Sequence, residues 1–188
     1  MSEQKIADPG PLGLAGFAMT TFCLSSANAN LWKGAGVTAA LSLAIFYGGL
    51  AQLLAGMWEF IRKNTFGAVA FTSYGAFWLS FWYLVPHLSG LPAGNDTVGI
   101  FLTGWAIFTV YMTLAAFKTS NAILVVFVLL SLTFIALAIG NWGAGHVNIV
   151  HLGGWLGLAT AGAAWYASAA GVVNETHGRV VLPVGPRG

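Results

Sequence analysis

Six long apolar segments, separated by short polar connections, constrain the fold of this chain more than any other feature. An α-helix needs about 20 mainly apolar residues to cross a bilayer. The charged side chains lie between these segments or at their ends. We therefore predict an all-α integral membrane protein, a bundle of six transmembrane helices at residues 11–29, 35–60, 66–84, 98–117, 121–141 and 148–170.

The composition excludes a water-soluble domain. Hydrophobic residues make up 57% of the 188 residues and charged residues only 6%, whereas about 25% of the residues in an average soluble domain are charged. The predicted organisation is a cytoplasmic N-terminal segment (1–10), a transmembrane domain (11–170) and a cytoplasmic C-terminal tail (171–188). The few bases are scattered and form no patch, so no nucleic-acid partner is expected.

The basic residues also predict the orientation. Cytoplasmic connections of membrane proteins carry an excess of lysine and arginine. With the N-terminus inside, Lys33 is the only one of the 7 bases that falls outside, which predicts that both termini are cytoplasmic. The inner bases are Lys5, Arg62, Lys63, Lys118, Arg179 and Arg187. The similar lengths of the first three and last three segments allow a 3+3 inverted repeat.

The second segment carries a small residue at nearly every fourth position, and the sixth segment repeats this pattern in a shorter form. Small residues let two membrane helices approach closely. We therefore expect tight helix contacts along both stripes. Their members are Gly36, Ala40, Ala44, Gly48, Gln52 and Gly56 in the second segment, and Gly153, Gly157 and Ala161 in the sixth.

Few titratable groups belong to the segments. Glu59 precedes Arg62 by three residues and Lys63 by four, a spacing typical of exposed ion pairs. Of the 4 histidines, only His151 lies clearly inside a segment. The sequence has no glycine-rich phosphate loop, no paired carboxylates and no Cys/His cluster with metal spacing. We expect no enzymatic activity, no metal site and no cofactor.

Several polar and aromatic side chains fall at one depth in the predicted bundle. With a rise of 1.5 Å per residue, five residues lie about 9 to 16 Å above the cytoplasmic ends of their helices. These residues are Phe17, Thr20, Gln52, Tyr74 and Leu132. Such a layer is typical of a pore for small solutes, in which apolar groups close the path and hydroxyl and amide groups bind the solute. An ordinary bundle core with one hydrogen-bonded glutamine fits the same pattern.

At this point several motifs resemble one known family. Asp8-Pro9-Gly10-Pro11-Leu12-Gly13-Leu14 is similar to the Asn-Pro-Ala-Pro-Leu-Gly-Leu signature of the acetate uptake transporter family, of the bacterial succinate-acetate permease type, with Asp8 and Gly10 as departures. The supporting motifs are Phe46-Tyr47-Gly48-Gly49-Leu50-Ala51-Gln52, Asn64-Thr65-Phe66-Gly67, Phe71-Thr72-Ser73-Tyr74-Gly75, Ala138-Ile139-Gly140-Asn141, Asn174-Glu175, Gly178-Arg179 and Leu182-Pro183.

The resemblance implies a multi-pass protein of the cell inner (plasma) membrane that takes up acetate and related short carboxylates, including succinate. It also implies a homo-hexamer with one pore per subunit and a constriction formed by Phe17, Tyr74 and Leu132. The candidate residues for binding the carboxylate are Thr20, Thr21, Gln52, Thr72, Tyr74 and Asn141. The cytoplasmic mouth is assigned to Asp8, Pro9, Pro11, Leu12 and Gly13.

Three mechanisms remain open from the sequence. In the first, neutral donors hold the carboxylate weakly in a channel-like path, which favours fast passage. In the second, a proton accompanies the carboxylate. Proton relays usually use intramembrane acids or histidines, so this mechanism needs His151 or entry of the protonated acid. In the third, the protein is a membrane scaffold or sensor that transports nothing.

Overall fold

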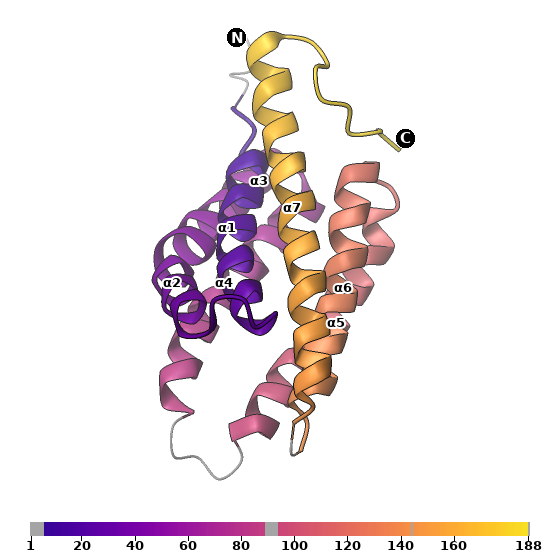
Figure 1. Cartoon of the computed structure of the whole chain (residues 1–188). Helices are drawn as coiled ribbons and strands as arrows, with labels where there is room; N and C mark the ends of the chain where they lie inside the picture. Colours follow the sequence, from indigo (N-terminus) through magenta and orange to yellow (C-terminus); the bar gives the residue numbers. More distant parts are fainter. Residues whose placement is uncertain (1–5, 89–93, 144, 188) are drawn as a thin grey trace.

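The computed structural model describes residues 6–88, 94–143 and 145–187, and all regular structure within these ranges is helical (Figure 1). The elements are α1 (Gly10–Asn28), α2 (Lys33–Ile45), the π-helix η1 (Phe46–Ala51), α3 (Gln52–Ile61), α4 (Thr65–His87), α5 (Gly94–Ala116), α6 (Asn121–Asn141) and α7 (Val147–His177). The predicted inner base Lys5 and the start of the predicted N-terminal segment lie outside the described residues.

Five helical stretches are long and apolar enough to cross a membrane. They are Lys33–Ile61, which joins α2, η1 and α3, and then Thr65–His87, Gly94–Ala116, Asn121–Asn141 and Val147–His177. The 19-residue α1 is not among them. Its second half carries buried hydroxyl groups, such as those of Thr20, Ser25 and Ser26. Because α1 packs against α2 and α7, neighbouring helices cover these groups.

The helix boundaries agree with the prediction except at α7. The segment at 121–141 is confirmed as α6, whereas α7 continues to His177, beyond the predicted end of the transmembrane domain at residue 170. It ends at Gly178, which adopts a left-handed conformation with φ of 62°, as is common at a helix C-terminus. The first part of the predicted tail is therefore helical. The prediction used apolar length, which marks the end of a membrane span and not the end of a helix that continues with polar residues.

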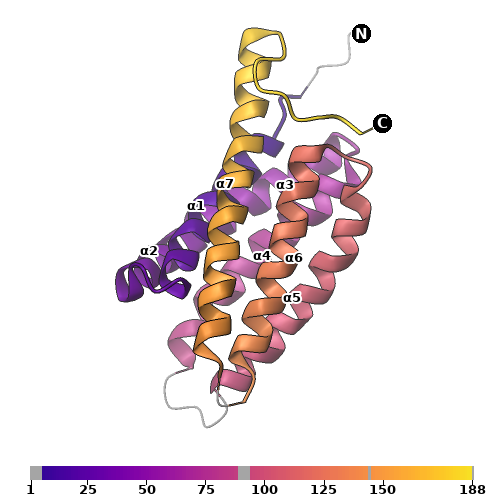
Figure 2. The ribbon, with the colours of Figure 1, turned by 45° about the vertical axis from the view of Figure 1, so that its right-hand side comes forward.

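The rest of the tail returns along the bundle. Asn174 on α7 accepts hydrogen bonds from the backbone N–H groups of Val181 and Leu182 at 2.7 and 2.9 Å. Further on, the N–H of Arg187 donates to the carbonyl oxygen of Thr119 at 2.9 Å. The C-terminal tail thus lies beside the α5–α6 connection, and both chain ends are at the same end of the bundle (Figures 1 and 2).

The small-residue stripes are confirmed as sites of close approach. A Cβ built on Gly48 would lie 2.4 Å from the hydroxyl oxygen of Thr20 on α1, and one built on Gly56 would lie 2.3 Å from that of Thr72 on α4. On α7, a Cβ at Gly157 would meet the Ser25 hydroxyl oxygen at 2.1 Å. No side chain larger than hydrogen fits at these three positions without movement of the neighbouring helix.

Gly154 and Gly162 on α7 provide a matched test of this packing. A Cβ at Gly154 would lie 2.2 Å from the backbone nitrogen of Ala29, whereas a Cβ at Gly162 meets nothing within 4 Å. We expect Gly154→Ala to destabilise the fold by about 1–3 kcal/mol through overpacking. Gly162→Ala should stabilise it by up to about 1 kcal/mol. Thermal unfolding of the purified variants checks this, and equal midpoints would contradict the predicted contact.

A feature that the sequence analysis did not predict is the π-helix η1, which lies between α2 and α3. On an α-helix, a stripe with one member at every fourth position drifts by about 40° per repeat. The wider turn of a π-helix reverses part of this drift. Gln52, directly after η1, is therefore buried, with 1% of its surface exposed. The second half of the chain has no such interruption in α6, and the inverted repeat stays a prediction.

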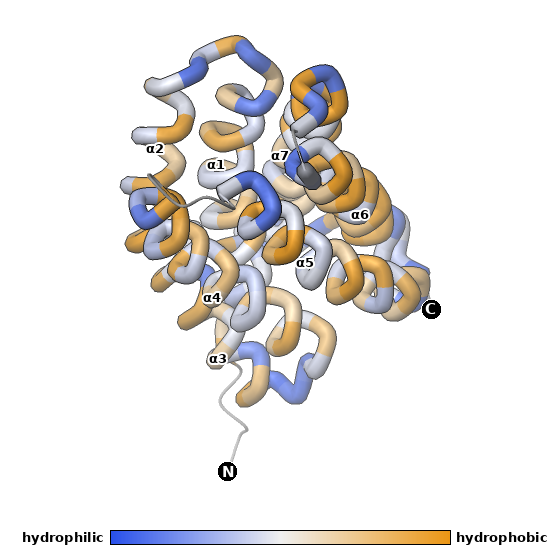
Figure 3. Tube along the Cα trace, turned by 90° about the horizontal axis from the view of Figure 1, so that it is seen from below, coloured by the Kyte–Doolittle hydropathy of each residue, from blue (hydrophilic) through white to orange (hydrophobic). Residues whose placement is uncertain are grey.

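Apolar residues dominate the helices, and hydrophilic residues gather in the connections (Figure 3). Many large apolar side chains point away from the bundle, including those of Phe46 and Leu114, which are 69% and 67% exposed. A soluble monomer rarely exposes so much apolar surface. This surface fits a lipid environment or contact with further subunits.

Candidate functional site: a path of three chambers

Three cavities follow one another through the bundle, beginning at the end that holds both chain termini. We call them the terminal, middle and far chambers; their volumes are about 270, 30 and 150 Å³. Their polar linings are Asp8, Glu59, Arg62, Asn64 and Thr119 in the terminal chamber, Gln52 and Tyr74 in the middle chamber, and Thr21, Ser25, Asn28, Trp78, Thr133 and Asn141 in the far chamber.

Adjacent chambers share wall residues. Leu14, Phe66, Phe71 and Ile123 line both the terminal and the middle chamber, and Phe17 and Leu130 line both the middle and the far chamber. The middle chamber has room for about two water molecules, since one water needs roughly 10–15 Å³. The three cavities thus form a row, which we call the path; shared side chains separate them, and the middle one is the smallest.

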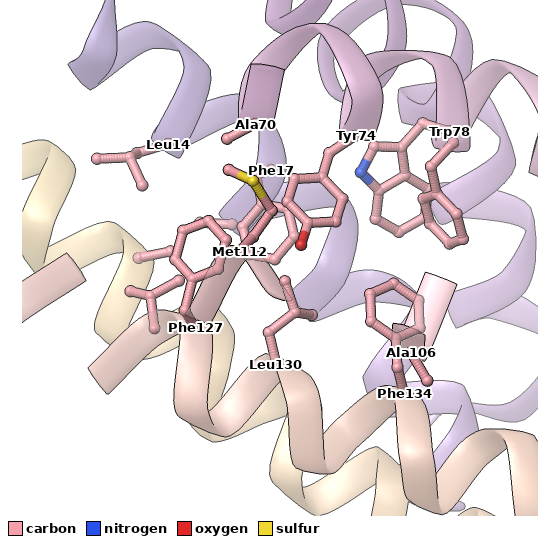
Figure 4. Packing of buried hydrophobic residues seen from close by; sticks show 14 of the residues in the cluster. Leu14, Phe17, Ala70, Tyr74, Trp78, Ala106, Met112, Phe127, Leu130 and Phe134 are labelled. Atoms are coloured by element: carbon pink, nitrogen blue, oxygen red, sulfur yellow. The ribbon is translucent and has the colours of Figure 1, made fainter. Parts of the chain in front are cut away.

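Phe17, Tyr74 and Leu130 form the narrow section, coming from α1, α4 and α6 (Figure 4). The ring centroids of Phe17 and Tyr74 are 5.9 Å apart, and all three side chains are at least 95% buried. The depth estimate from the sequence placed Phe17 and Tyr74 at one level. The structure also brings them together.

The prediction that Leu132 is the leucine of the constriction is wrong. Its side chain is 47% exposed, whereas Leu130 is 3% exposed and lines two chambers. Two residues along an α-helix turn the side chain by about 200°, so Leu132 lies on the opposite side of α6. Height along the helix axis could not distinguish these two leucines, because they differ by only about 3 Å.

Tyr74 contributes its ring to the path and uses its hydroxyl elsewhere. Its oxygen lies 2.8 Å from the hydroxyl oxygen of Thr109 on α5. The Thr109 hydroxyl itself donates to the carbonyl oxygen of Trp105 at 2.7 Å, so Tyr74 is the donor to Thr109. The predicted role of Tyr74 as a hydrogen-bond donor to the carboxylate is therefore corrected to that of a wall.

Gln52 lies in the middle chamber as predicted for a residue on the path. Its Oε1 atom is buried and has no hydrogen-bond partner among the described residues. An unpartnered amide oxygen in an apolar enclosure is costly. Because Oε1 can only accept, its position points to a guest molecule that donates, such as water or a protonated acid; a carboxylate would bind the amide N–H group instead.

Thr21 and Asn141, two of the predicted binding residues, both line the far chamber. Trp78 lines it too, although the sequence did not predict a role for this residue. The Thr21 hydroxyl and the Trp78 indole Nε1 are buried and without partners in the described part of the chain. Both groups donate hydrogen bonds, so they suit a carboxylate. The sequence pattern gave Trp78 no distinction from other membrane aromatics, because only its packing shows that it lines a cavity.

Thr20 and Thr72 line none of the three chambers, contrary to their prediction as binding residues. Thr20 packs against Gly48 and donates to the carbonyl oxygen of Gly16 at 2.8 Å. Thr72 lies against Gly56. Both hydroxyl groups lie at close contacts between helices. When neighbouring helices cover every face of a helix, a helical wheel does not distinguish such a position from one that lines a pore.

Only some of the residues predicted to form the cytoplasmic mouth line the terminal chamber. Asp8 and Pro11 line the terminal chamber, whereas Leu12 is 45% exposed and Gly13 packs against the ring of Phe71. Pro9 precedes α1 and its carbonyl oxygen accepts from the Gly13 N–H at 3.1 Å. Asp8 also accepts from the Gly10 N–H at 2.9 Å, at the first residue of α1.

Glu59 is the largest departure from the sequence interpretation. The prediction of an exposed ion pair is wrong, because the side chain is 1% exposed and lines the terminal chamber. Asn64 donates to its Oε2 at 3.0 Å, and a nitrogen of Arg62 lies 3.9 Å from the same oxygen. Arg62 forms a closer ion pair with Asp8. The N-terminal segment covers the end of α3, and this long-range contact buries Glu59.

The structure also bears on His151 and on a possible metal site. His151 is partly exposed on α7 and lines none of the three chambers. Across residues 6–88, 94–143 and 145–187, no three His, Cys, Asp or Glu side chains lie close enough to hold a metal ion. Among the described Asp, Glu, His, Lys and Arg side chains, those that line the three chambers are therefore Asp8, Glu59 and Arg62 in the terminal chamber.

Comparisons with known proteins agree with this architecture. The chain is 43% identical over 188 residues to the succinate-acetate/proton symporter SatP of Escherichia coli K12, with 98% of each chain covered. It is 38% identical to acetate permease A of Emericella nidulans, covering 98% of this chain and 67% of that one. These relatives are transporters and not enzymes.

A solved structure, that of the bacterial acetate channel SatP, matches with a TM-score of 0.89 and 42% identity, over 96% of this chain and all of the other. The family model described as the GPR1/FUN34/yaaH family matches residues 1–186. The resemblance seen in the sequence motifs is thereby confirmed. Over nearly its whole length, the chain belongs to the GPR1/FUN34/yaaH family.

Proposed function

We propose that this protein transports acetate and other short carboxylates, such as succinate, across the cell inner membrane along the three chambers. The observation that carries the proposal is the row of three neighbouring cavities, the smallest of which is lined by Phe17, Tyr74 and Leu130. The names of the relatives, a succinate-acetate/proton symporter and an acetate permease, support the same substrate class.

In the proposed orientation the terminal chamber is cytoplasmic. The described bases Arg62, Lys63, Lys118, Arg179 and Arg187 belong to that end of the six-helix bundle, in agreement with the positive-inside rule. The far chamber then receives the carboxylate from outside. There the Thr21 hydroxyl and the Trp78 N–H replace part of its hydration shell, before the solute passes an apolar section.

The proposed assembly is a homo-hexamer in which each subunit has its own path. The exposed apolar side chains on η1, α3 and α5 support subunit contacts, since some must be covered by lipid or by other copies. Chemical cross-linking in membranes is expected to give products up to six chains. A largest product of two or three chains would contradict the hexamer without affecting the path within one subunit.

Uptake of labelled acetate by liposomes that contain only this protein tests the proposed function. We expect uptake well above that of protein-free liposomes, which take up acetic acid by diffusion through the lipid. Uptake equal to that of protein-free liposomes would contradict transport and would favour the scaffold or sensor alternative.

The adjacent pair Thr21 and Thr20 separates binding from helix packing. Thr21→Val removes a donor that faces the far chamber, and a hydrogen bond to a charged group contributes about 1.5–3 kcal/mol. We expect the KM for acetate to rise by about tenfold or more. Thr20→Val should leave the KM unchanged because Thr20 faces Gly48. Equal effects of the two substitutions in the liposome assay would contradict this assignment.

A further inference from the structure

Three charged side chains share the wall of the terminal chamber. Asp8 comes from the segment before α1, and Glu59 and Arg62 come from the end of α3. The other elements that line the chamber contribute no ionisable side chain. From α4 and its cap come Asn64, Phe66, Gly67 and Phe71. The connection before α6 contributes Thr119, α6 contributes Ile123, and α7 contributes Ala167 and Gly171. The charge balance of this chamber therefore depends on the triad Asp8–Arg62–Glu59 alone.

The two carboxylates of the triad are not equivalent. Asp8 is 41% exposed and is in direct contact with the Arg62 guanidinium. Glu59 is 1% exposed, and its oxygen is 3.9 Å from the nearest guanidinium nitrogen. A buried charge is stable only when it is paired and hydrogen-bonded. Glu59 is thus the member of the triad whose negative charge is least compensated.

Asn64 fixes the position of the Glu59 carboxylate. Its Oδ1 accepts from the Gly67 N–H at 3.1 Å, so its Nδ2 is the atom that donates to Glu59. Glycine at position 67 leaves room for this contact, because a Cβ there would lie 2.9 Å from a Glu59 oxygen. Glu59 therefore occupies a prepared place for a carboxylate, at the N-terminus of α4 and beside a guanidinium.

The arrangement sets a condition for the entry of a second anion. With all three groups ionised, the triad carries one net negative charge, and a substrate carboxylate beside Arg62 would add another in a partly enclosed cavity. A proton on Glu59 removes this repulsion and makes the triad neutral, so that the Arg62 guanidinium can pair with the substrate carboxylate as well as with Asp8. The Arg62 guanidinium beside Glu59 then also attracts the substrate carboxylate.

We propose that the terminal chamber is a binding site for the substrate carboxylate at Arg62, and that one proton is taken up by Glu59 for each anion bound. The proton comes from the solution and forms the O–H bond of the Glu59 carboxylic acid; it returns to the solution when the anion leaves and Glu59 is ionised again. The proposal rests on the proposed transport function, and it assigns the proton that accompanies the substrate to Glu59 in place of His151.

Proton uptake on binding tests this site without any transport. Sodium acetate is added to saturation to the purified protein in weak buffer with a pH indicator, and the signal of a protein-free blank is subtracted. We expect uptake of one proton per chain in the wild type and in the control Glu175→Gln, which alters an exposed acid outside the terminal chamber. Glu59→Gln should abolish proton uptake while binding of labelled acetate persists.

The pH dependence of acetate binding gives the second readout. Where Glu59 is ionised, the wild-type affinity should fall tenfold for each unit of rising pH, whereas the affinity of Glu59→Gln should not change with pH. Arg62→Gln should weaken binding at this site by about tenfold or more, since it removes a charge-assisted contact. Unchanged proton uptake in Glu59→Gln, or a wild type that binds acetate without proton uptake, would overturn the proposal.

Infrared difference spectra of the wild type need no variant and keep the test valid if Glu59→Gln does not fold. Addition of ¹³C-labelled acetate should produce the C=O band of a protonated protein carboxyl group, and its absence would overturn the proposal. The outcome is also independent of flux. Acetate flux without proton uptake contradicts this site and leaves transport intact, whereas proton-linked binding without flux contradicts transport and leaves this site intact.

Discussion

Leu130→Ala is expected to admit larger carboxylates than the wild-type protein does. The substitution removes three carbon atoms from the narrowest section of the path, where Leu130 separates the middle from the far chamber. The middle chamber, through which the solute must pass, has a volume of only about 30 Å³. Removing the Leu130 side chain therefore enlarges this section considerably. We expect uptake of four- and five-carbon acids to rise about tenfold relative to acetate, measured by competition in liposomes.

Leu132→Ala is the matched control for this result. It makes the same chemical change on the same helix, two residues away and on an exposed face. Its selectivity should equal that of the wild type. An altered selectivity in Leu132→Ala with an unchanged one in Leu130→Ala would show that the leucine of the constriction had been assigned to the wrong face of α6.

Gln52→Leu is expected to reduce acetate uptake by about tenfold to a hundredfold. Gln52 and Tyr74 are the polar residues that line the middle chamber, and the Tyr74 hydroxyl is already bonded to Thr109. The Gln52 amide is therefore the group available to a solute there. A lost hydrogen bond of about 1.5–3 kcal/mol corresponds to this range of rates.

Thr72→Val is the control for Gln52→Leu. Thr72 also has a buried hydroxyl without a partner among the described residues, but it lies against Gly56 and lines none of the three chambers. Uptake by Thr72→Val should stay within about twofold of the wild type. If both substitutions reduced uptake equally, the loss would reflect general disturbance of the helix packing and not an interaction with the solute.

The helical architecture could be predicted because its signals are local. Apolar length defines a membrane span within one stretch of sequence, and small residues at every fourth position reveal a close contact without any knowledge of the partner helix. The Gly48 and Gly56 contacts were predictable in this way. The π-helix that contains Gly48 was not, since no residue type alone requires the wider turn.

The errors at the site have two causes, and the first is that the position of a side chain depends on its angle about the helix axis. Leu130 and Leu132 share almost the same height, and Thr20 and Thr21 are adjacent, yet one member of each pair faces the path. In a helix that is covered on most sides, apolar periodicity does not identify the inner face. Glu59 shows the second cause: its burial depends on the N-terminal segment, which is distant in sequence.

The most direct test of the central claim asks whether the carboxylate passes Leu130. Cys23 is the single cysteine of the chain, so a Cys23→Ser background allows one thiol to be introduced at a chosen position. We would measure labelled acetate uptake by liposomes containing Leu130→Cys or Leu132→Cys before and after complete modification with a bulky thiol reagent. The account predicts that modification stops uptake in Leu130→Cys and leaves it unchanged in Leu132→Cys. Continued uptake after complete modification of Leu130→Cys would contradict a path through these chambers.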